Sequence, residues 1–482
     1  MHGLHHTNLF REACYINGEW VHADTNQTIA VINPYDGQVI GHIPNCAQAE
    51  TKRAILCAHT AWHSFKQLSA KERCDLLLAW ARLIDHHKED LARLMTIEQG
   101  KPLFESRGEI DYANSFIKWF AEEGRRVYGD VIPSNQRHQH ILVIKQAIGV
   151  VAAITPWNFP AAMITRKIAP ALAVGCTVVV KPDKKTPFSA LALASLAEEA
   201  GFPPGVFNVI TGNSEVIGLE MSTNTLVRKL SFTGSTVVGR LLMQQCAGTI
   251  KKISLELGGN APFIVFDDAD LDAAVQGAIA SKFRNTGQTC VCANRVLLQD
   301  SIYAEFTKKL VHAVAQLKVG NGFDPDVNLG PLIDEAALKK VKEHVQDAKQ
   351  KGGQIICGGK EHALGGLFYE PTVITEANSA MRLSKEETFG PVAALFRFHT
   401  EEEALLMAND TEYGLASYFY SNHMDRIWRV SEGLEYGMVG VNAGIVSTEV
   451  APFGGIKQSG IGREGSKYGI DPYIDIKYLC LG

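Results

Sequence analysis

The sequence predicts an α/β fold in which mostly parallel sheets are covered by helices. From residue 142 onward, short apolar runs alternate with segments of helical periodicity, which is the pattern of repeated βαβ units. The chain has 482 residues and 46% hydrophobic content, enough for two or three domains with large cores. No internal repeat or low-complexity tract interrupts this pattern.

In the first unit, the strands are predicted over residues 148–154, 177–180, 206–210 and 227–232, and the helices over 161–174, 189–199 and 237–245. Parallel strands with covering helices are typical of nucleotide-binding architectures. A second unit begins after Gly258 and Gly259, with a strand over 261–266 and a helix over 271–283. This helix delivers Cys290 on the loop that follows, and reactive residues often occupy such loops.

Composition excludes several classes of function. The formal net charge is −5, with both signs interspersed, so we expect neither a nucleic acid nor a membrane as partner. No run of eighteen apolar residues occurs, and the first residues lack a cationic segment followed by an apolar one, so a cytoplasmic location is expected. The 10 dispersed cysteines fit reduced thiols better than a disulfide framework.

Three segments carry residue types that acyl-transfer chemistry requires. Cys290 is surrounded by small polar residues and is a candidate nucleophile, although an inert buried cysteine fits equally well. Glu256 precedes two glycines and is a candidate general base, with a strand-end ion pair as the alternative. Asn158, between Trp157 and Phe159, is a candidate oxyanion donor or a turn-capping residue.

These segments closely resemble the corresponding motifs of the aldehyde dehydrogenase superfamily, both in their order along the chain and in their residues. The likeness continues through Phe232–Ser235, Glu386–Pro391 and Pro452–Gly455, and matches run from about Gly18 to Gly482. Two segments narrow the resemblance to the succinate-semialdehyde dehydrogenase branch by their exact residues: Phe283–Cys292 and Gly462–Ile470.

The resemblance implies a domain organisation. Residues 8–124 and 147–257 would form a Rossmann-type NAD(P)-binding domain, and residues 258–441 an α/β catalytic domain. Residues 125–146 and 442–482 would supply a small β hairpin for oligomerisation and a substrate loop. A homo-oligomer, either dimer or tetramer, is therefore expected.

The resemblance also implies a reaction. The Cys290 thiolate would attack an aldehyde to give a thiohemiacetal, and hydride loss to nicotinamide would leave a thioester. Asn158 and the Cys290 main-chain N–H would stabilise the oxyanion. Glu256 would activate the hydrolytic water, and its presence favours hydrolysis over transfer to coenzyme A.

NADP is the expected cofactor, with NAD possible. A G-x-G-x-x-G match at residues 460–465 follows a glycine-rich loop instead of a strand and is rejected as a dinucleotide site. Lys184 stands where NAD-preferring relatives commonly carry glutamate, and a cation there favours a 2′-phosphate, although a solvated lysine is the alternative. The resemblance assigns cofactor contacts to Thr155, Trp157, Lys181, Lys184, Gly234, Ser235, Glu387 and Phe389.

A carboxylate-bearing aldehyde is the expected substrate. Arg166 and Arg284 match the family's carboxylate-binding arginines, and Ser447 matches its hydroxyl donor; each arginine taken alone fits a structural ion pair equally well. Phe159 and Phe453 would form the apolar walls of the pocket. Glutarate semialdehyde, one methylene longer, is the close rival, followed by a general aldehyde dehydrogenase and a catalytically silent structural protein of the same fold.

Cys292 follows the candidate nucleophile by two residues. It could form a reversible disulfide with Cys290 under oxidation, or it could be a packing cysteine. No cysteine or histidine pair follows at ligand spacing, so no metal site is predicted.

Overall fold

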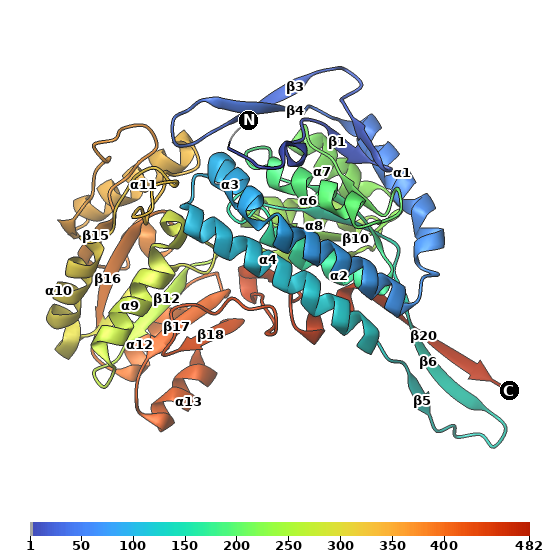
Figure 1. Cartoon of the computed structure of the whole chain (residues 1–482). Helices are drawn as coiled ribbons and strands as arrows, with labels where there is room; N and C mark the ends of the chain where they lie inside the picture. The colour runs from blue at the N-terminus through green and yellow to red at the C-terminus, as the bar shows by residue number, and fades with distance from the viewer. Residues whose placement is uncertain (1–2) are drawn as a thin grey trace.

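The computed structural model describes residues 3–482, which contain two large sheets, each layered between helices (Figure 1). The first sheet has the strand order β19 (Gly460–Ile461), β11 (Lys252–Glu256), β10 (Val227–Thr233), β7 (Val150–Ile154), β8 (Thr177–Lys181), β9 (Phe207–Val209), β1 (Cys14–Ile16) and β2 (Glu19–Val21). The five inner strands from β11 to β9 are parallel, and β1, β2 and β19 add antiparallel edges.

Helices cover both faces of the first sheet because its strands alternate between two apolar cores. Val151 and Ala153 of β7 point into one core, and Val150 and Ala152 point into the other. The first core is closed by α2 (Ala70–His86), α3 (Lys88–Gln99), α4 (Leu103–Glu123), α5 (Ala162–Val174) and α6 (Phe188–Glu199). The second core is closed by α1 (Gln48–Phe65), α7 (Ser214–Thr223) and α8 (Thr236–Ala247).

The second sheet is built in the same way. Its strand order is β14 (Gln354–Cys357), β15 (Thr372–Ala377), β16 (Val392–Phe398), β13 (Ala293–Gln299), β12 (Ala261–Val265), β17 (Ala416–Tyr420) and β18 (Met438–Val441). One face packs on α9 (Leu271–Lys282) and α10 (Tyr303–Val314). The other face packs on α11 (Glu335–Gln350), α12 (Glu401–Asn409) and α13 (Met424–Gly433).

Two small sheets complete the described chain. The strands β20 (Ile474–Leu481), β6 (His140–Ala147) and β5 (Asp130–Ile132) form an antiparallel sheet that projects from the body of the molecule (Figure 1). The strands β3 (Thr28–Ile32) and β4 (Val39–Pro44) pair as a separate hairpin. The projecting sheet joins the two segments, 125–146 and 442–482, for which the sequence predicts an oligomerisation role.

The predicted α/β fold is confirmed, and each predicted strand and helix lies within two residues of its observed bounds. One detail differs: α9 ends at Lys282, so Arg284 begins the short η3 turn (Arg284–Gly287) instead of ending the helix. The rejected glycine motif begins at β19, which pairs antiparallel with β11 and does not open a helix. The domain boundaries stay a prediction.

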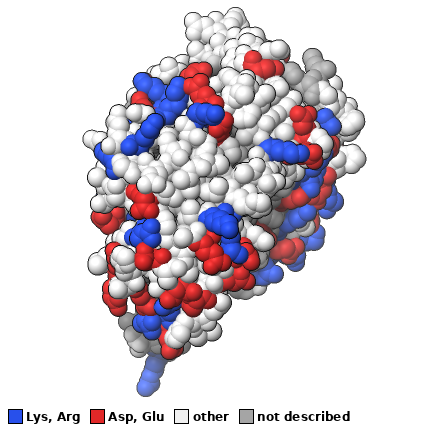
Figure 2. Space-filling model, turned by 90° about the vertical axis from the view of Figure 1, so that its left-hand side faces the viewer, with Lys and Arg blue, Asp and Glu red and all other residues white. Residues whose placement is uncertain are grey.

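The surface agrees with the charge balance of the sequence. On the face shown in Figure 2, lysine and arginine side chains are interspersed with aspartate and glutamate. Within residues 3–482, no helix combines the length and the hydrophobicity that a bilayer-spanning helix needs.

Candidate active site

A cavity of about 510 Å³ lies where the sequence-predicted residues converge. It opens beyond the carboxyl ends of β7, β10 and β11, the edge at which α/β sheets bind ligands. Its lining includes Trp157, Asn158, Gly234, Ser235, Cys290, Glu387 and Phe389. A larger cavity of about 1070 Å³ beside the paired strands β6 and β20 is lined by none of the predicted site residues.

The loop that carries Cys290 is held in an unusual backbone conformation. Asn285 and Thr286 have φ values of 50° and 58°, in the left-handed region that side chains avoid. Gly287, with φ 75°, passes so close to Gly390 that a Cβ would lie 2.2 Å from its carbonyl oxygen. Such strain persists where surrounding contacts impose it, and here it places Cys290 at the cavity wall.

The surroundings of Cys290 hold its thiol neutral. Its pKa is raised to about 12, mainly by burial and also by the carboxylates of Glu387 and Glu256, while Arg166 and Arg284 oppose the shift. In the unliganded protein, desolvation of the thiol therefore outweighs the effect of both arginines. The arginines are nevertheless the groups that favour the thiolate.

Glu256 ends β11 with its carboxylate buried and unpartnered. Its side chain is 3% exposed, and neither carboxylate oxygen has a hydrogen-bond partner within residues 3–482. Burial and the nearby Glu464 raise its pKa well above the ordinary value. The raised pKa brings the carboxyl toward the range useful to a general base, and within residues 3–482 it makes no strand-end ion pair.

A buried charge cluster that the sequence did not predict adjoins Glu256. The carboxylate of Glu464 contacts Lys167 Nζ, and its Oε2 lies 2.7 Å from Arg166 Nε, an ion pair without hydrogen-bond alignment. Burial alone would raise the pKa of Glu464, but Lys167 and Arg166 bring it below its ordinary value. Glu464 therefore stays charged and disfavours ionisation of Glu256.

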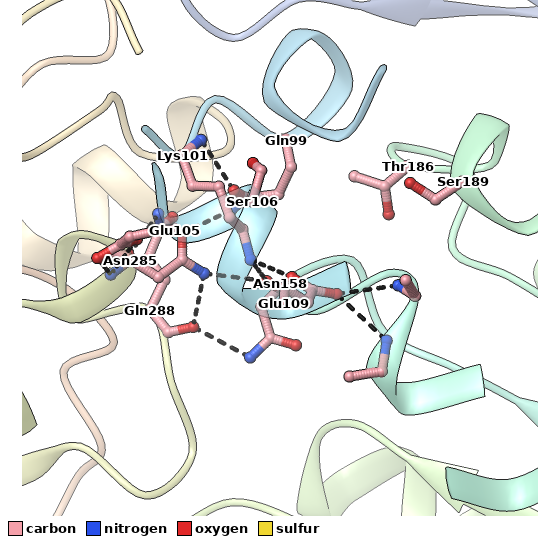
Figure 3. A network of polar contacts seen from close by, with 12 residues as sticks. Gln99, Lys101, Glu105, Ser106, Glu109, Asn158, Thr186, Ser189, Asn285 and Gln288 are labelled. Carbon is pink, nitrogen blue, oxygen red and sulfur yellow. Dashed lines mark hydrogen bonds and ion pairs between the residues drawn. The ribbon is translucent and has the colours of Figure 1, made fainter. Parts of the chain in front are cut away.

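Asn158 is held by a network that crosses three elements (Figure 3). Its side-chain amide nitrogen donates to the Gln288 main-chain carbonyl at 3.0 Å. The main-chain carbonyl of Asn158 accepts from Lys101 Nζ at 2.7 Å and from Asn285 Nδ2 at 3.0 Å. Gln99 in turn donates to Asn285 at 3.0 Å. One N–H of the Asn158 amide is left for a ligand, since Gln288 takes the other.

Lys101 and Glu109 anchor this network and were not predicted. Their charged groups lie 2.5 Å apart with side chains only 1% exposed. Glu109 Oε1 also accepts the main-chain N–H groups of Ala161 and Ala162, at the start of α5. The pair thus connects Asn158 with the helix that carries Arg166. Sequence spacing offers no signal for this connection, because Ala161 and Ala162 lie over fifty residues from Glu109.

The predicted substrate residues lie around the other side of Cys290. Arg166 is 1% exposed, and its guanidinium lies 3.9 Å from the ring centre of Phe453. It combines the two sequence readings: its Nε pairs with Glu464, while its Nη2 has no partner within residues 3–482. Arg284 lies 5.3 Å over the ring of Phe159, and no ion pair engages it in the described chain.

Tyr112 of α4 joins this group and was missed by the sequence reasoning. Burial raises the pKa of its phenol, and Arg166, Arg284 and Ser447 are close enough to lower it. Its hydroxyl nevertheless has no aligned hydrogen-bond partner in residues 3–482. Tyr112 and two guanidinium groups thus lie near Ser447, with the rings of Phe453 and Phe159 against the guanidinium groups.

The predicted cofactor residues divide into two groups. Gly234 and Ser235 line the cavity at the start of α8, where Ser235 accepts the Val238 N–H at 3.4 Å. Glu387 lines it as well, accepts from the Gly259 N–H at 3.2 Å, and has a pKa raised to about 7 by burial. Phe389 packs edge-on against Trp157, with ring centres 5.6 Å apart.

The lysines lie further along. Lys184 is exposed and lines a neighbouring cavity of about 730 Å³, which shares Lys185 and Asp334 with the first. Lys181 lines neither cavity: its buried ammonium donates to the Pro182 carbonyl at 3.2 Å, and burial lowers its pKa. The hydroxyl of Thr155 is buried without a partner in residues 3–482.

Cys292 points away from a disulfide partner. Its thiol is buried and donates to the carbonyls of Lys282 and Gly287, at 3.4 and 3.5 Å. These contacts support the packing role; the redox role stays a prediction.

A thiol, a buried carboxyl and a side-chain amide beside a groove with a helix N-terminus define a cysteine-dependent oxidoreductase of α/β architecture. Comparisons with known proteins identify the family to which the chain belongs. Residues 20–479 match the model of the aldehyde dehydrogenase family, and the chain belongs to this family. The predicted family and enzyme class are therefore confirmed.

Similar proteins cover nearly the whole chain. The NADP-dependent succinate-semialdehyde dehydrogenase of Escherichia coli is 60% identical over 99% of both chains. A glutarate-semialdehyde dehydrogenase of Pseudomonas aeruginosa is likewise 60% identical over 99% of both. The crystal structure of a succinate-semialdehyde dehydrogenase from Burkholderia pseudomallei superposes with a TM-score of 0.99 at 58% identity, over 99% of both chains.

Proposed function

We propose that this protein oxidises succinate semialdehyde to succinate with NADP as hydride acceptor. The observation that carries the substrate is the convergence of Arg166 and Arg284 beside Cys290, where both act on the thiol charge. A guanidinium that retains free donors in an apolar pocket binds a carboxylate through charge-assisted hydrogen bonds. Relatives named for succinate and glutarate semialdehydes support a substrate with an aldehyde at one end and a carboxylate at the other.

Each residue of the cavity has a distinct task in this proposal. The Cys290 sulfur attacks the aldehyde carbon, and the free N–H of Asn158 stabilises the oxyanion of the thiohemiacetal. When bound, NADP supplies the hydride acceptor through which the thiohemiacetal becomes a thioester. Glu256, once ionised, removes a proton from the water that hydrolyses this thioester, and its lack of any other partner leaves both carboxylate oxygens available.

The groove fits a dinucleotide. The N-terminus of α8, capped by Ser235, lines the groove and suits a pyrophosphate, although the Gly234 N–H is donated to the Glu256 carbonyl at 3.1 Å. Glu387 and Phe389 would hold the nicotinamide end near Cys290. Lys184 would face the ribose phosphate, because it is exposed in the connected cavity and no ion pair engages it within residues 3–482. Lys185, by contrast, pairs with Asp334 at 2.6 Å.

The substrate proposal is tested by comparing kcat/KM for succinate semialdehyde and butanal, which has the same number of carbons and no carboxylate. We expect a preference of about a hundredfold or more, near 2.7 kcal/mol, and its loss in Arg284→Gln. Near-equal values would make the arginines structural and the protein a general aldehyde dehydrogenase. A stronger preference for glutarate semialdehyde would assign the longer substrate.

The cofactor proposal is tested with Lys184→Glu. The added carboxylate repels a 2′-phosphate and can bind ribose hydroxyls, so the ratio of kcat/KM with NADP to that with NAD should fall at least about tenfold. Lys308→Glu, the same change at an exposed lysine of α10, serves as the control. Equal ratios in the two variants would make Lys184 a bystander.

A homo-oligomer in the cytoplasm completes the proposal. Val131 and Ile476 of the projecting sheet are 82% and 72% exposed, and isolated hydrophobic strands of this kind usually pack against a partner. Sedimentation of the intact chain distinguishes monomer, dimer and tetramer. The alternative of a catalytically silent fold is disfavoured, since Cys290, Glu256 and Asn158 surround one site and such a fold would need none of them.

A further inference from the structure

Three imidazoles meet where the N-terminal segment crosses the corner between α2 and α3, a region marked in Figure 1 by the N-terminus and the α3 label. His86 ends α2, His87 follows it, and His6 directly precedes the η1 turn (Thr7–Leu9). One ring nitrogen of each lies within 4.8 Å of the others. We refer to His6, His86 and His87 as the three-histidine cluster.

The spacing of the rings suits a shared metal ion. Metal–nitrogen bonds of 2.0–2.1 Å at tetrahedral angles place the ring centres of two histidine ligands about 5 Å apart. In the cluster, the ring centres are 4.4 Å apart for His6 and His87, 4.8 Å for His86 and His87, and 6.0 Å for His6 and His86. These separations bracket the expected value. His6 and His86 are exposed and can adjust.

His87 supplies an independent indication. Its side chain is only 7% exposed, and its Nδ1 has no hydrogen-bond partner within residues 3–482. A buried polar atom of this kind requires explanation, because most such atoms are satisfied.

Asp90 orients the ring of His6. Its carboxylate is 3% exposed, and its Oδ2 lies 2.8 Å from His6 Nδ1. The same carboxylate accepts the main-chain N–H groups of His5 and His6, at 2.8 and 2.9 Å. A carboxylate on one imidazole nitrogen fixes the tautomer and leaves the other nitrogen, here Nε2 of His6, as the one that can bind a metal, as in carboxylate–histidine–metal arrangements.

We propose that the three-histidine cluster binds one divalent transition-metal ion of the Zn²⁺ class, with a water molecule as fourth ligand. Imidazole nitrogen suits Zn²⁺, Ni²⁺ and Cu²⁺ better than Mg²⁺ or Ca²⁺. The ion fastens the N-terminal segment to the α2–α3 corner. Sequence spacing gave no signal for this site, because His6 lies 80 residues before His86 and the fold alone brings them together.

The test uses the full chain without an affinity tag, stripped of metal with a chelator and titrated with Co²⁺ alone. We expect one Co²⁺ per chain, with visible ligand-field bands and no sulfur-to-cobalt charge-transfer band, and displacement of Co²⁺ by Zn²⁺. Bound metal should also raise the Tm, since it binds only the folded chain. His6→Ala and His86→Ala should each weaken binding at least about tenfold.

His5→Ala is the matched control, because His5 is an exposed neighbour outside the cluster. It should bind Co²⁺ as the unaltered chain does. His86 is exposed, so its replacement leaves the fold intact and the comparison interpretable. Undiminished binding in both His6→Ala and His86→Ala, a charge-transfer band that places the metal on cysteine, or an absence of binding at millimolar Co²⁺ would each overturn the proposal.

Discussion

Two groups of buried side chains near Cys290, on either side of the active-site region, differ in how completely their polar atoms are satisfied. On the side of Asn158, none of the buried side-chain polar atoms of Gln99, Lys101, Glu109, Asn285 and Gln288 lacks a partner within residues 3–482. On the opposite side, unpartnered atoms gather: both oxygens of Glu256, Nη2 of Arg166 and the hydroxyl of Tyr112. The two sides meet at Cys290.

This difference separates positioning from chemistry. A satisfied network stabilises one geometry, because breaking any contact leaves a buried group unpaired. Unsatisfied groups lower the stability of the unliganded protein, and they persist where a ligand completes them. The comparison therefore predicts that changes on the network side alter stability, whereas changes on the unsatisfied side alter turnover or substrate affinity.

Replacing Cys290 should have the largest effect on turnover. Cys290→Ser should lower kcat by at least about ten-thousandfold, because the covalent step loses its nucleophile. NADP binding, followed by fluorescence titration, should persist because the groove is unchanged. Cys292→Ala is the matched control, and it should retain most activity under reducing conditions. Equal losses in both variants would contradict the assignment of Cys290 as nucleophile.

Glu256→Gln should lower kcat about 10²- to 10⁴-fold, the range for loss of a general base. Since burial raises the pKa of Glu256, the base is ionised only as the pH rises above the ordinary carboxyl range, so kcat of the unaltered enzyme should increase with pH there. The variant should lose this rise and keep a burst of one NADPH per site. Absence of the burst would place Glu256 before hydride transfer.

Lys101→Met should chiefly reduce stability. It leaves Glu109 buried without its counter-ion, which costs about 3–5 kcal/mol in the free energy of unfolding. Lys71→Met removes the same charge from an exposed pair with Asp75 and should lower the free energy of unfolding far less. Urea unfolding at one protein concentration gives both values. Similar losses would show that burial of the network does not matter.

Sequence reasoning reached the fold, and it could propose reacting groups, because the signals for both are local. Apolar alternation identifies β7, α5 and β8 without any knowledge of their neighbours, and the motif around Cys290 is contiguous. The partners of those groups are not local. Glu464 contacts Lys167 across 297 residues, and Asn285 contacts Gln99 across 186. Residue spacing carries no signal for such contacts.

Arg166 illustrates the same limit within one residue. Its sequence context predicted either a carboxylate ligand or a structural ion pair, and the structure gives Nε to Glu464 and leaves Nη2 free. Choosing one of these two roles for the whole residue fails, because Nε and Nη2 of the same guanidinium have different surroundings. Tyr112 was missed because a single tyrosine, outside any recognisable motif, does not indicate a functional role.

Tyr112→Phe gives the smallest effect and the sharpest test of the comparison. The removed hydroxyl has no aligned partner, so the Tm should stay unchanged or rise slightly. Between Arg166 and Arg284, the same hydroxyl can donate to a substrate carboxylate, and its loss should raise KM for succinate semialdehyde about three- to tenfold while leaving butanal unaffected. Tyr418→Phe is the matched control, because that hydroxyl donates to the Val291 carbonyl at 2.7 Å and its removal should lower the Tm. A lower Tm with an unaltered KM in Tyr112→Phe would instead show that the unsatisfied hydroxyl has a structural role. The proposed division of the active-site region into a stabilising side and a substrate-binding side would then be wrong.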